Sequence, residues 1–349
     1  MQTSSASRVE DVDGAAEVPV SILVVSYNTR EETLECLASV VEATQGTAYE
    51  LIVVDNDSTD GSTDAIEEQF PAIQLLRSPQ NVGFGAANNL AAQHARGRRL
   101  LLLNPDTLVR VDAVTRIVRF ADEHPDARLW GGRTIALDGS LNIGSCWGAP
   151  TLWSTFCRAV GLSSVFPRVE AFHREALGDW QRDSVREVDI VAGCFLLIDR
   201  GLWNDLGGFH PDFFMYGEDI DLSLRAGRLG ARPLICPEAE IVHLCGVSER
   251  VRSAKLVRLF TARAQLYRKF WNPTAAWLGV RLIELRVLTR IAGTALLAPL
   301  RARSRSSLSE WLQVWRERAT WRRAFRTTKR YERFDPGAWA GDRVRGTSA

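Results

Sequence analysis

The sequence has few of the features that mark secreted or disulfide-stapled proteins. Its 349 residues include only six cysteines, and no two of them form a Cys-x-x-Cys pair. Scattered cysteines in a chain of this size are typical of a reduced, cytoplasmic protein rather than of a disulfide scaffold. Residues 1–17 are polar and acidic and lack the basic start and apolar core of a signal peptide, so we expect a disordered tail there.

Lysine is also scarce, at three of the 43 basic residues, and charge of each sign is unevenly distributed. From Arg250 onward the chain has 23 basic and 6 acidic side chains, about +17, which leaves about −16 for residues 1–249 although the net charge is only +1. Such a split indicates a basic segment that meets an anionic partner, either a membrane surface or nucleic acid. The length and the 46% hydrophobic content suit one large or two medium domains.

The sequence lacks an uninterrupted membrane-spanning run. Residues 275–300 are the most apolar candidate, but charged side chains interrupt them, and each would be costly at bilayer depth. Their spacing places the charges near one face of a helix, away from Trp277 and the leucines. The charged residues are Arg281, Glu284, Arg286 and Arg290.

We therefore expect an amphipathic helix that lies in the membrane surface. Three tryptophans among arginines further along fit the same contact, namely Trp311, Trp315 and Trp321. The alternative is a helical extension that packs on the domain or on a second subunit of a homo-oligomer.

What the sequence does contain is an alternation of strand-like and helix-like segments from Val18 to about Trp130. The apolar strand-like runs are 20–26, 51–55, 73–76 and 100–103. The helical stretches between them are 31–43, 61–69 and 84–95. Alternation of this kind predicts an α/β fold with a parallel sheet that helices cover on both faces.

The segments beyond residue 130 are less regular. A hairpin is predicted to turn at Asp138-Gly139, and scattered aromatics predict a partly helical insertion. A strand, a helix, a strand pair and a basic helical tail follow. In chain order these segments are 133–143, 147–187, 188–198, 218–229, 232–244 and, for the tail, from about Arg252 onward.

Polar clusters follow successive strands of this predicted sheet. The first is Ser26-Tyr27, where an aromatic ring can lie flat against a nucleobase or be half-buried at the sheet top. The second is Asp55-Asn56, whose side chains could pair with the imide edge of uracil or thymine. Residues 58–60 beyond it could instead merely cap a helix.

The third cluster is NVGFGAANN, residues 81–89. Gly83 and Gly85 permit close backbone approach to a ribose or phosphate, and a helix follows directly. Asn81 and Asn88 flank the glycines and are candidate nucleotide ligands. A Gly-x-Gly is, however, also common in tight turns.

The fourth cluster ends the run LLLNPDT, which a proline bounds in the manner of a short buried strand. Asp106 then emerges at the carboxyl end of the strand, where open α/β sheets bind ligands. A carboxylate there is costly to desolvate unless a positive group meets it, such as a divalent metal that carries phosphates. The alternative is a turn or helix-capping aspartate.

The order and spacing of these tracts resemble glycosyltransferase family 2, the inverting enzymes of the GT-A fold. The tracts that carry the resemblance are VSYNT, VVDN, NVGFGAANN, LLLNPD and FFMYGEDIDL. The resemblance implies that NPD stands where the family carries its metal-binding aspartates. Asn104 takes the first of those positions and contacts the nucleotide, and Asp106 is the carboxylate ligand.

Residues 207–230 look like the signature around the catalytic base of that family. By this resemblance Asp219 deprotonates a sugar hydroxyl, and Glu218 and Asp221 hold the site or contact the acceptor. The carboxylates open a helix, whose amino end stabilises them as anions. One turn further on, Arg225 is placed to pair with Asp221.

The tract IVHLCGVS presents His243 in the context in which similar enzymes complete their metal site. With Asp106 and diphosphate oxygens, a neutral imidazole suits Mn²⁺ or Mg²⁺. A structural histidine is the alternative. Gly193 and Cys194 are predicted to border the sugar pocket, because small residues leave room there.

The tracts look most like the rhamnosyltransferase branch of the family. This implies transfer of L-rhamnose from dTDP-rhamnose to a glycan or polyprenyl-diphosphate-linked sugar, in cell-envelope polysaccharide synthesis. It also implies a peripheral enzyme at the inner face of the cell membrane that binds no nucleic acid. The implied fold is a mostly parallel mixed sheet flanked by helices, with a nucleotide half (18–130) and an acceptor half (131–250), followed by a basic helical extension (251–349).

Three alternatives stay open beside this hypothesis. One is a family 2 enzyme that uses a UDP- or GDP-sugar. Another is a non-catalytic protein that binds a membrane or nucleic acid. The third, a sugar-nucleotide pyrophosphorylase, requires a glycine-rich basic loop after the first strand, and SYNTREE at that position argues against it.

Overall fold

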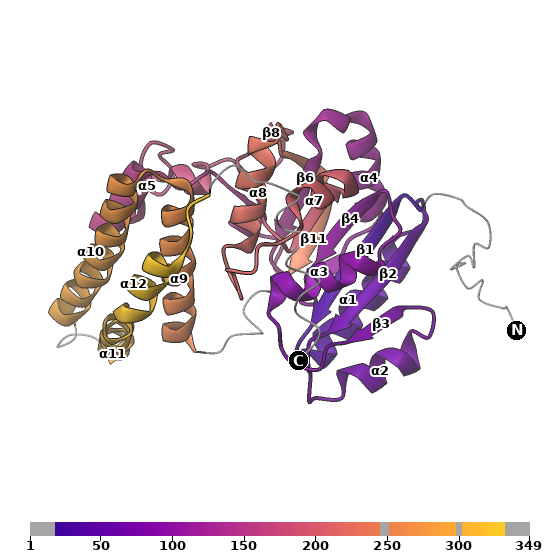
Figure 1. The fold of residues 1–349 in the computed structure, drawn as a ribbon, viewed down its shortest axis with the longest axis horizontal. Helices are drawn as coiled ribbons and strands as arrows, with labels where there is room; N and C mark the ends of the chain where they lie inside the picture. Colours follow the sequence, from indigo (N-terminus) through magenta and orange to yellow (C-terminus); the bar gives the residue numbers. More distant parts are fainter. Residues whose placement is uncertain (1–17, 245–250, 298–301, 332–349) are drawn as a thin grey trace, which may run out of the picture.

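A sheet domain and a bundle of helices stand side by side in this chain (Figure 1). The computed structural model describes residues 18–244, 251–297 and 302–331. The predicted tail of residues 1–17 lies outside the described residues.

Four strands alternate with three helices over residues 20–103, as the sequence predicts. They are β1 Val20–Ser26, α1 Arg30–Ala43, β2 Tyr49–Asp55, α2 Ser62–Gln69, β3 Gln74–Arg77, α3 Phe84–His94 and β4 Arg99–Leu103. Every residue of β1 is buried, and its side chains alternate between two apolar cores. Val20 and Ile22 belong to one core and Leu23 to the other, so helices cover both faces of the sheet.

The rest of the sheet domain, residues 104–244, adds further strands and a partly helical insertion. Its strands are β5 Thr107–Val109, β6 Leu129–Ile135, β7 Cys146–Trp147, β8 Arg186–Glu187, β9 Ile190–Val191, β10 Phe195–Asp199 and β11 Leu234–His243. Its helices are α4 Ala113–Glu123, α5 Leu152–Val160, α6 Leu162–Val165, α7 Arg200–Leu206 and α8 Glu218–Arg228. The predicted helix over 218–229 and the predicted insertion are confirmed.

Within the described chain the sheet has the order β3-β2-β1-β4-β10-β6-β11-β5, with β8 beside β11. Strands β3, β2, β1 and β4 are parallel, whereas β10 runs antiparallel to both β4 and β6. The sheet is therefore mixed, and the predicted α/β fold class is confirmed. The carboxyl ends of β2, β1 and β4 share one edge.

Three sequence predictions in the acceptor half are wrong in detail. The strand predicted over 188–198 is broken by a turn at residues 192–194 into β9 and β10. The strand pair predicted over 232–244 is the single strand β11, whose pairing with β6 shifts register between Cys236 and Glu240. The hairpin predicted over 133–143 turns at Gly139, with φ of 80°, but its arms share one isolated bridge because β6 pairs mainly with β10 and β11.

The described part of the basic extension folds into four helices that pack on one another and on α5. They are α9 Arg252–Phe270, α10 Pro273–Leu297, α11 Ala302–Arg316 and α12 Arg318–Thr327. Their core includes Phe260, Tyr267, Ile283 and Val287. In Figure 1 this bundle lies at the opposite end of the molecule from β2 and β3.

The predicted membrane role of the tryptophans is wrong for two of the three. Trp321 is fully buried, with its ring edge-on to Phe260, and Trp311 lies in the same core. Trp315 packs against that core from its rim. Amphipathic helices in a bundle and on a membrane share one sequence pattern, so the pattern alone could not separate them. Among the described helices, none is long and apolar enough to cross a membrane.

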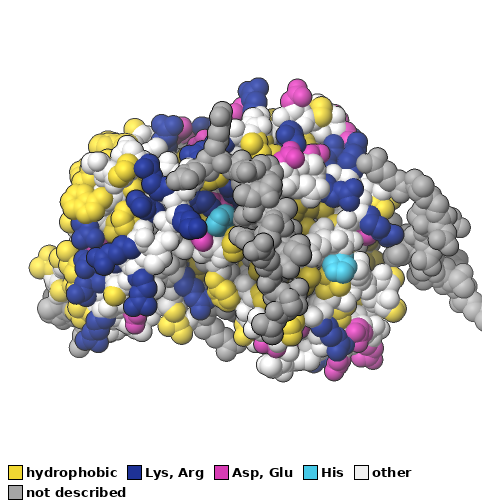
Figure 2. Space-filling model, viewed as in Figure 1, with side chains coloured by type: hydrophobic (Ala, Val, Ile, Leu, Met, Phe, Trp, Pro, Cys, Tyr) yellow, Lys and Arg dark blue, Asp and Glu magenta, His cyan; other side chains and the backbone are white. Residues whose placement is uncertain are grey.

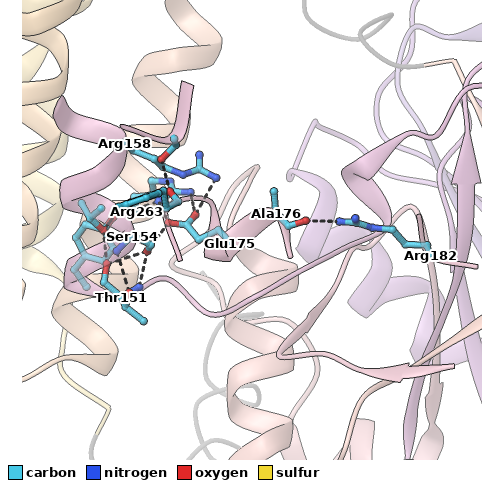
Figure 3. A network of polar contacts seen from close by, with 11 residues as sticks. Thr151, Ser154, Arg158, Glu175, Ala176, Arg182 and Arg263 are labelled. Atoms are coloured by element: carbon cyan, nitrogen blue, oxygen red, sulfur yellow. Dashed lines mark hydrogen bonds and ion pairs between the residues drawn. The ribbon is translucent and has the colours of Figure 1, made fainter. Parts of the chain in front are cut away.

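A buried polar network fastens the bundle to the insertion (Figure 3). Glu175 pairs with Arg263 of α9 at 2.5 Å and with Arg158 of α5 at 3.3 Å, and it accepts a hydrogen bond from the Ser154 hydroxyl at 2.8 Å. Burial alone would raise the pKa of Glu175, but the two arginines more than offset this and lower it to about 2. The carboxylate is thus a fixed anionic tie between α5 and α9.

Candidate active site

Three strand ends bring the predicted nucleotide residues together. Ser26 of β1 pairs in register with Asp55 of β2, and β4 lies on the other side of β1. The Ser26 hydroxyl is buried against Thr33 at 2.9 Å, so its role is to shape the turn. The Tyr27 side chain is 42% exposed and accessible to a ligand.

Asp55 is buried with one oxygen engaged and the other free. Its Oδ2 accepts a hydrogen bond from the Ser58 backbone N–H at 3.0 Å. Its Oδ1 has no hydrogen-bond partner among the described residues. A buried acceptor left unpaired costs about 1–3 kcal/mol, which a ligand N–H at this position would offset.

The residues after Asp55 tie loops together rather than simply cap α2. The Asn28 side-chain oxygen accepts a hydrogen bond from the Thr59 N–H at 2.8 Å, and the Asn28 N–H donates to the Ser58 hydroxyl at 2.9 Å. Asp60 accepts from the Arg30 N–H at the start of α1 and from the Ser62 N–H at the start of α2. These bonds fix the loops on either side of Tyr27.

The predicted asparagines hold the third loop. The Asn56 amide accepts from the Val82 N–H at 3.0 Å and donates to the Asn81 oxygen at 3.1 Å, which also accepts from the Gly83 N–H. Asn88 is buried and donates to the Phe84 carbonyl one turn earlier. Their amides shape the loop, and direct contact with a nucleotide stays a prediction.

The glycines of this loop lie against a neighbouring protein segment rather than against open space. Gly83 has φ of 83°, and a Cβ there would lie 2.3 Å from the Phe214 carbonyl oxygen. A Cβ on Gly85 would lie 3.1 Å from the Phe209 Cβ. The Phe84 N–H donates to that same Phe214 carbonyl at 3.1 Å. The loop before α3 is thereby fastened to the segment that leads into α8.

Asp106 and His243 meet at the end of β11. The Asp106 Oδ1 and His243 Nε2 are 3.3 Å apart, and both side chains are largely buried. The Leu244 N–H donates to the Asp106 carbonyl, and His243 is paired with Thr107 across β11 and β5. Two elements more than 130 residues apart in the chain thus place an oxygen and a nitrogen side by side.

This pair fits a divalent ion as two of its ligands. Adjacent ligands around an octahedral ion with bonds of about 2.1 Å lie about 3 Å apart, close to the observed separation. Within the described part of the chain, no group of three or more His, Cys, Asp or Glu side chains could hold a metal. Asp106 and His243 would therefore leave most coordination positions to the substrate.

Short backbone contacts connect this pair to the predicted base. The Asn104 N–H donates to the Cys194 carbonyl at 3.2 Å, and the Gly193 N–H donates to Asp219 Oδ2 at 3.3 Å. The other oxygen of Asp219 accepts from the Ile220 N–H at 2.8 Å. The turn at residues 192–194, which breaks the predicted strand, thus lies between Asp106 and Asp219.

Glu218 and Asp219 sit at the amino end of α8 with different surroundings. Glu218 is buried, and its Oε2 has no hydrogen-bond partner among the described residues. Burial, reinforced by the adjacent Asp219, raises the pKa of Glu218 to about 8. Burial also raises the pKa of Asp219. Glu218 is therefore largely protonated at neutral pH and able to donate a hydrogen bond.

Asp221 belongs to a closed ion cluster. It pairs with Arg225 at 2.6 Å, which confirms the predicted pairing, and with Lys269 of α9 at 2.6 Å. Burial raises the pKa of Asp221, but the two cations outweigh it and the net shift is downward. With no exposed surface, Asp221 holds α8 in place, and its predicted contact with the acceptor finds no support in this geometry.

Sequence reasoning missed Lys269 and Asn89. Lys269 comes from the extension, and its only sequence signal is that lysine is rare here. The Asn89 side chain accepts a hydrogen bond from the Phe209 N–H and donates one to the Phe209 carbonyl, so it clamps α3 to the segment before α8. The two adjacent asparagines of NVGFGAANN gave no sign of which one makes this long-range clamp.

Replacing Lys269 with methionine should destabilise the protein strongly, because Asp221 would lose one of two buried partners. Breaking a buried ion pair costs about 3–5 kcal/mol, and we expect about 3 kcal/mol here since Arg225 remains. Urea unfolding measures the change. Lys329→Met is the matched control, because Lys329 is exposed and should unfold like the wild type. Equal midpoints for both variants would contradict a role for Lys269 in the cluster.

Residues 21–173 match the family model described as glycosyl transferase family 2. This part of the chain, a little under half of its 349 residues, is similar to family 2 glycosyltransferases. Both the predicted family resemblance and the predicted enzyme class, a glycosyltransferase, are confirmed.

Two relatives and one solved structure illustrate the likeness. An N-acetylglucosaminyl-diphospho-decaprenol L-rhamnosyltransferase of Mycobacterium tuberculosis is 29% identical over 64% of this chain and 75% of that protein. The O-antigen biosynthesis protein RfbC of Myxococcus xanthus is 26% identical over 66% of this chain and 18% of that protein. A mannosyltransferase from Pyrobaculum calidifontis, solved with GDP-Man and Mn²⁺, is 20% identical with a TM-score of 0.54 and covers 89% of this chain and 90% of its own. The last likeness shows the fold alone.

Proposed function

We propose that this chain is an inverting, metal-dependent transferase that moves L-rhamnose from dTDP-rhamnose to a lipid-linked or glycan acceptor. The observation that carries the proposal is the pairing of Asp106 with His243 at one sheet edge, linked to Asp219 through Asn104, Cys194 and Gly193. The name of the mycobacterial relative supports both the donor sugar and a polyprenyl-linked acceptor.

In the proposed reaction Asp219 accepts the proton of an acceptor hydroxyl. The hydroxyl oxygen then bonds to the anomeric carbon, and the bond from that carbon to the diphosphate oxygen breaks on the opposite face. The nucleoside diphosphate leaves with the electron pair. Asp106 and His243 would hold a divalent ion, which neutralises charge on the departing diphosphate.

The other residues would position the substrates. Tyr27 would stack on the base, and the free oxygen of Asp55 would accept a hydrogen bond from its N–H edge. Protonated Glu218 would donate a hydrogen bond to the sugar or the acceptor. Gly193 lies against the Phe84 ring, since a Cβ there would be 3.2 Å from it, and its N–H would keep Asp219 oriented toward the acceptor. A lipid-linked acceptor would bring the enzyme to the cytoplasmic face of the membrane.

A thermal-shift screen tests the donor. With Mn²⁺ present, dTDP-rhamnose should raise the Tm more than UDP-glucose or GDP-mannose at equal concentration. A ligand at a hundredfold excess over its Kd stabilises by about 2.7 kcal/mol, so we expect a rise of several degrees. A larger rise in Tm with the UDP- or GDP-sugar would mean that dTDP-rhamnose is not the donor. It would favour a family 2 enzyme with another donor sugar.

A further inference from the structure

Helix α10 is apolar on two sides, and the described residues cover only one of them. Val280, Ile283 and Val287 pack in the bundle core. The opposite side exposes Trp277 at 54% and Leu296 at 79%, with further leucines between them at helical spacing. These intervening residues are Leu278, Leu285 and Leu288. Arg281 lies beside them, with its guanidinium 5.9 Å from the Trp277 ring centroid. Apolar side chains gathered on an exposed surface commonly mark an interaction site, so the open side calls for a partner.

The insertion extends this open surface. Trp153, Phe156 and Val160 follow one another along one side of α5, and each is between 38% and 49% exposed. Val165 and Phe166 at the end of α6 are also exposed. We call the exposed apolar side chains of α5, α6 and α10 the apolar face. Figure 2 shows hydrophobic side chains gathered at the end of the molecule where α10 lies.

Direct bonds join the two parts of the apolar face. The Thr289 hydroxyl of α10 donates to the Ala159 carbonyl of α5 at 2.8 Å. Arg290 donates to the Ser164 hydroxyl of α6 at 3.2 Å. The insertion and the extension, which are far apart in the sequence, therefore present adjoining stripes of one surface.

The surroundings of the apolar face are strongly basic. Helices α9 to α12 carry sixteen lysines and arginines and only two acids, Glu284 and Glu310. Glu284 is already paired with Arg281 and Arg322. Arg286 and Arg290 lie near two further arginines, Arg158 and Arg263, and Glu175 is the acid that partly neutralises this positive charge. Burial, together with the repulsion between the arginines, lowers the pKa of Arg286 to about 9.

This charge decides between the candidate occupants. A second copy of the chain would bring the same positive excess to the interface and would be repelled. An anionic bilayer offers apolar depth for tryptophan, phenylalanine and leucine, and phosphates for the guanidinium groups. Nucleic acid would satisfy the arginines but would leave the aliphatic side chains in water.

We propose that the apolar face docks on an anionic membrane surface, with Arg290 at the level of the lipid phosphates. This inference rests on the proposed function, because a lipid-linked acceptor lies in that surface. In this arrangement the helical bundle is a rigid spacer between the membrane surface and the candidate active site. Lys269 of α9 is paired with Asp221, two residues from Asp219, so docking would set the height of the base above the bilayer.

Vesicle co-sedimentation of the full chain tests the inference. The wild type should bind vesicles that contain phosphatidylglycerol and bind pure phosphatidylcholine vesicles at least tenfold more weakly. Trp277→Ser with Leu288→Ser should weaken binding to the anionic vesicles about tenfold or more, and Arg290→Glu should weaken it severalfold. All three residues are exposed, so these variants should fold.

Matched controls come from the sheet domain. Val111→Ser with Leu137→Ser removes apolar side chains that are each 74% exposed, and Arg119→Glu reverses an exposed charge on α4. Both should bind anionic vesicles like the wild type. Equal loss in controls and test variants would overturn the proposal. So would a wild type that ignores vesicles, or a dimer by light scattering that Trp277→Ser with Leu288→Ser dissolves, or tight salt-sensitive nucleic-acid binding in place of vesicle binding.

Sugar transfer to a short, water-soluble acceptor separates this inference from the proposed function. The variants of the apolar face should retain transfer to that acceptor, since they lie outside the site. If vesicles bind as described but no nucleotide sugar is consumed with any acceptor, the docking surface stands and the enzymatic proposal falls.

Discussion

Replacing Asp219 with asparagine should lower kcat by about three orders of magnitude while nucleotide-sugar binding stays within a few fold. A positioned general base contributes about 10²–10⁴ to the rate, and asparagine keeps the shape of the side chain but cannot accept the proton. The Gly193 and Ile220 N–H groups can still donate to the amide oxygen. Single-turnover kinetics with titration calorimetry separates the two effects.

The pH profile adds a second readout for Asp219. The base must be ionised, so activity falls as the pH drops through its pKa. Because burial raises that pKa, the acidic limb of kcat/KM should lie above the value of about 4 for an ordinary aspartate. Asp64→Asn, at an exposed position on α2, should change neither rate nor profile. Retention of wild-type kcat by Asp219→Asn would remove the residue from its proposed role.

Removal of divalent metal should abolish transfer, and His243→Ala should lower metal affinity by about 10²-fold. Loss of one of two protein ligands leaves Asp106 alone to hold the ion against water. Mn²⁺ binding in the presence of the nucleoside diphosphate, followed by electron paramagnetic resonance, measures this without relying on turnover. Added Mn²⁺ should restore activity to chelator-treated wild type.

The histidine control is His94→Ala, because His94 is exposed on α3 away from the sheet edge. It should bind Mn²⁺ normally. Full activity of the wild type after exhaustive chelation would exclude the pair as a metal site. In that case the 3.3 Å contact would be an ordinary hydrogen-bonded ion pair.

The nucleotide half could be predicted from sequence because its signals are local. Short apolar runs bounded by Gly, Pro and Asp fixed β1, β2 and β4, and their parallel order followed from the intervening helices. The convergence of Asp106 and His243 came from the family resemblance, since no spacing rule links residues so far apart. The fold then supplied the geometry that brings them within reach.

What could not be predicted depends on tertiary contacts. The break at Gly193 serves a hydrogen bond to Asp219 that no local pattern announces. The sequence predicts membrane contact for Trp321 and Trp311, which lie in the bundle core, because bundle cores and bilayers favour the same residues. The role of Lys269 could not be predicted either, because its partner Asp221 is 48 positions earlier in the chain.

The ion pair between α8 and α9 means that the sheet domain depends on the helical extension for part of its own stability. A gene fusion that replaced the region after residue 250 with a foreign membrane anchor would remove Lys269. The buried Asp221 carboxylate would then keep only Arg225 of its two cationic partners. Successful chimeras should therefore retain α9 or import a lysine in its place. Shortening the chain after residue 300 keeps that lysine but removes Trp311 and Trp321, which exposes Phe260 and the rest of the bundle core. Precipitation rather than release from lipid would then be its first symptom.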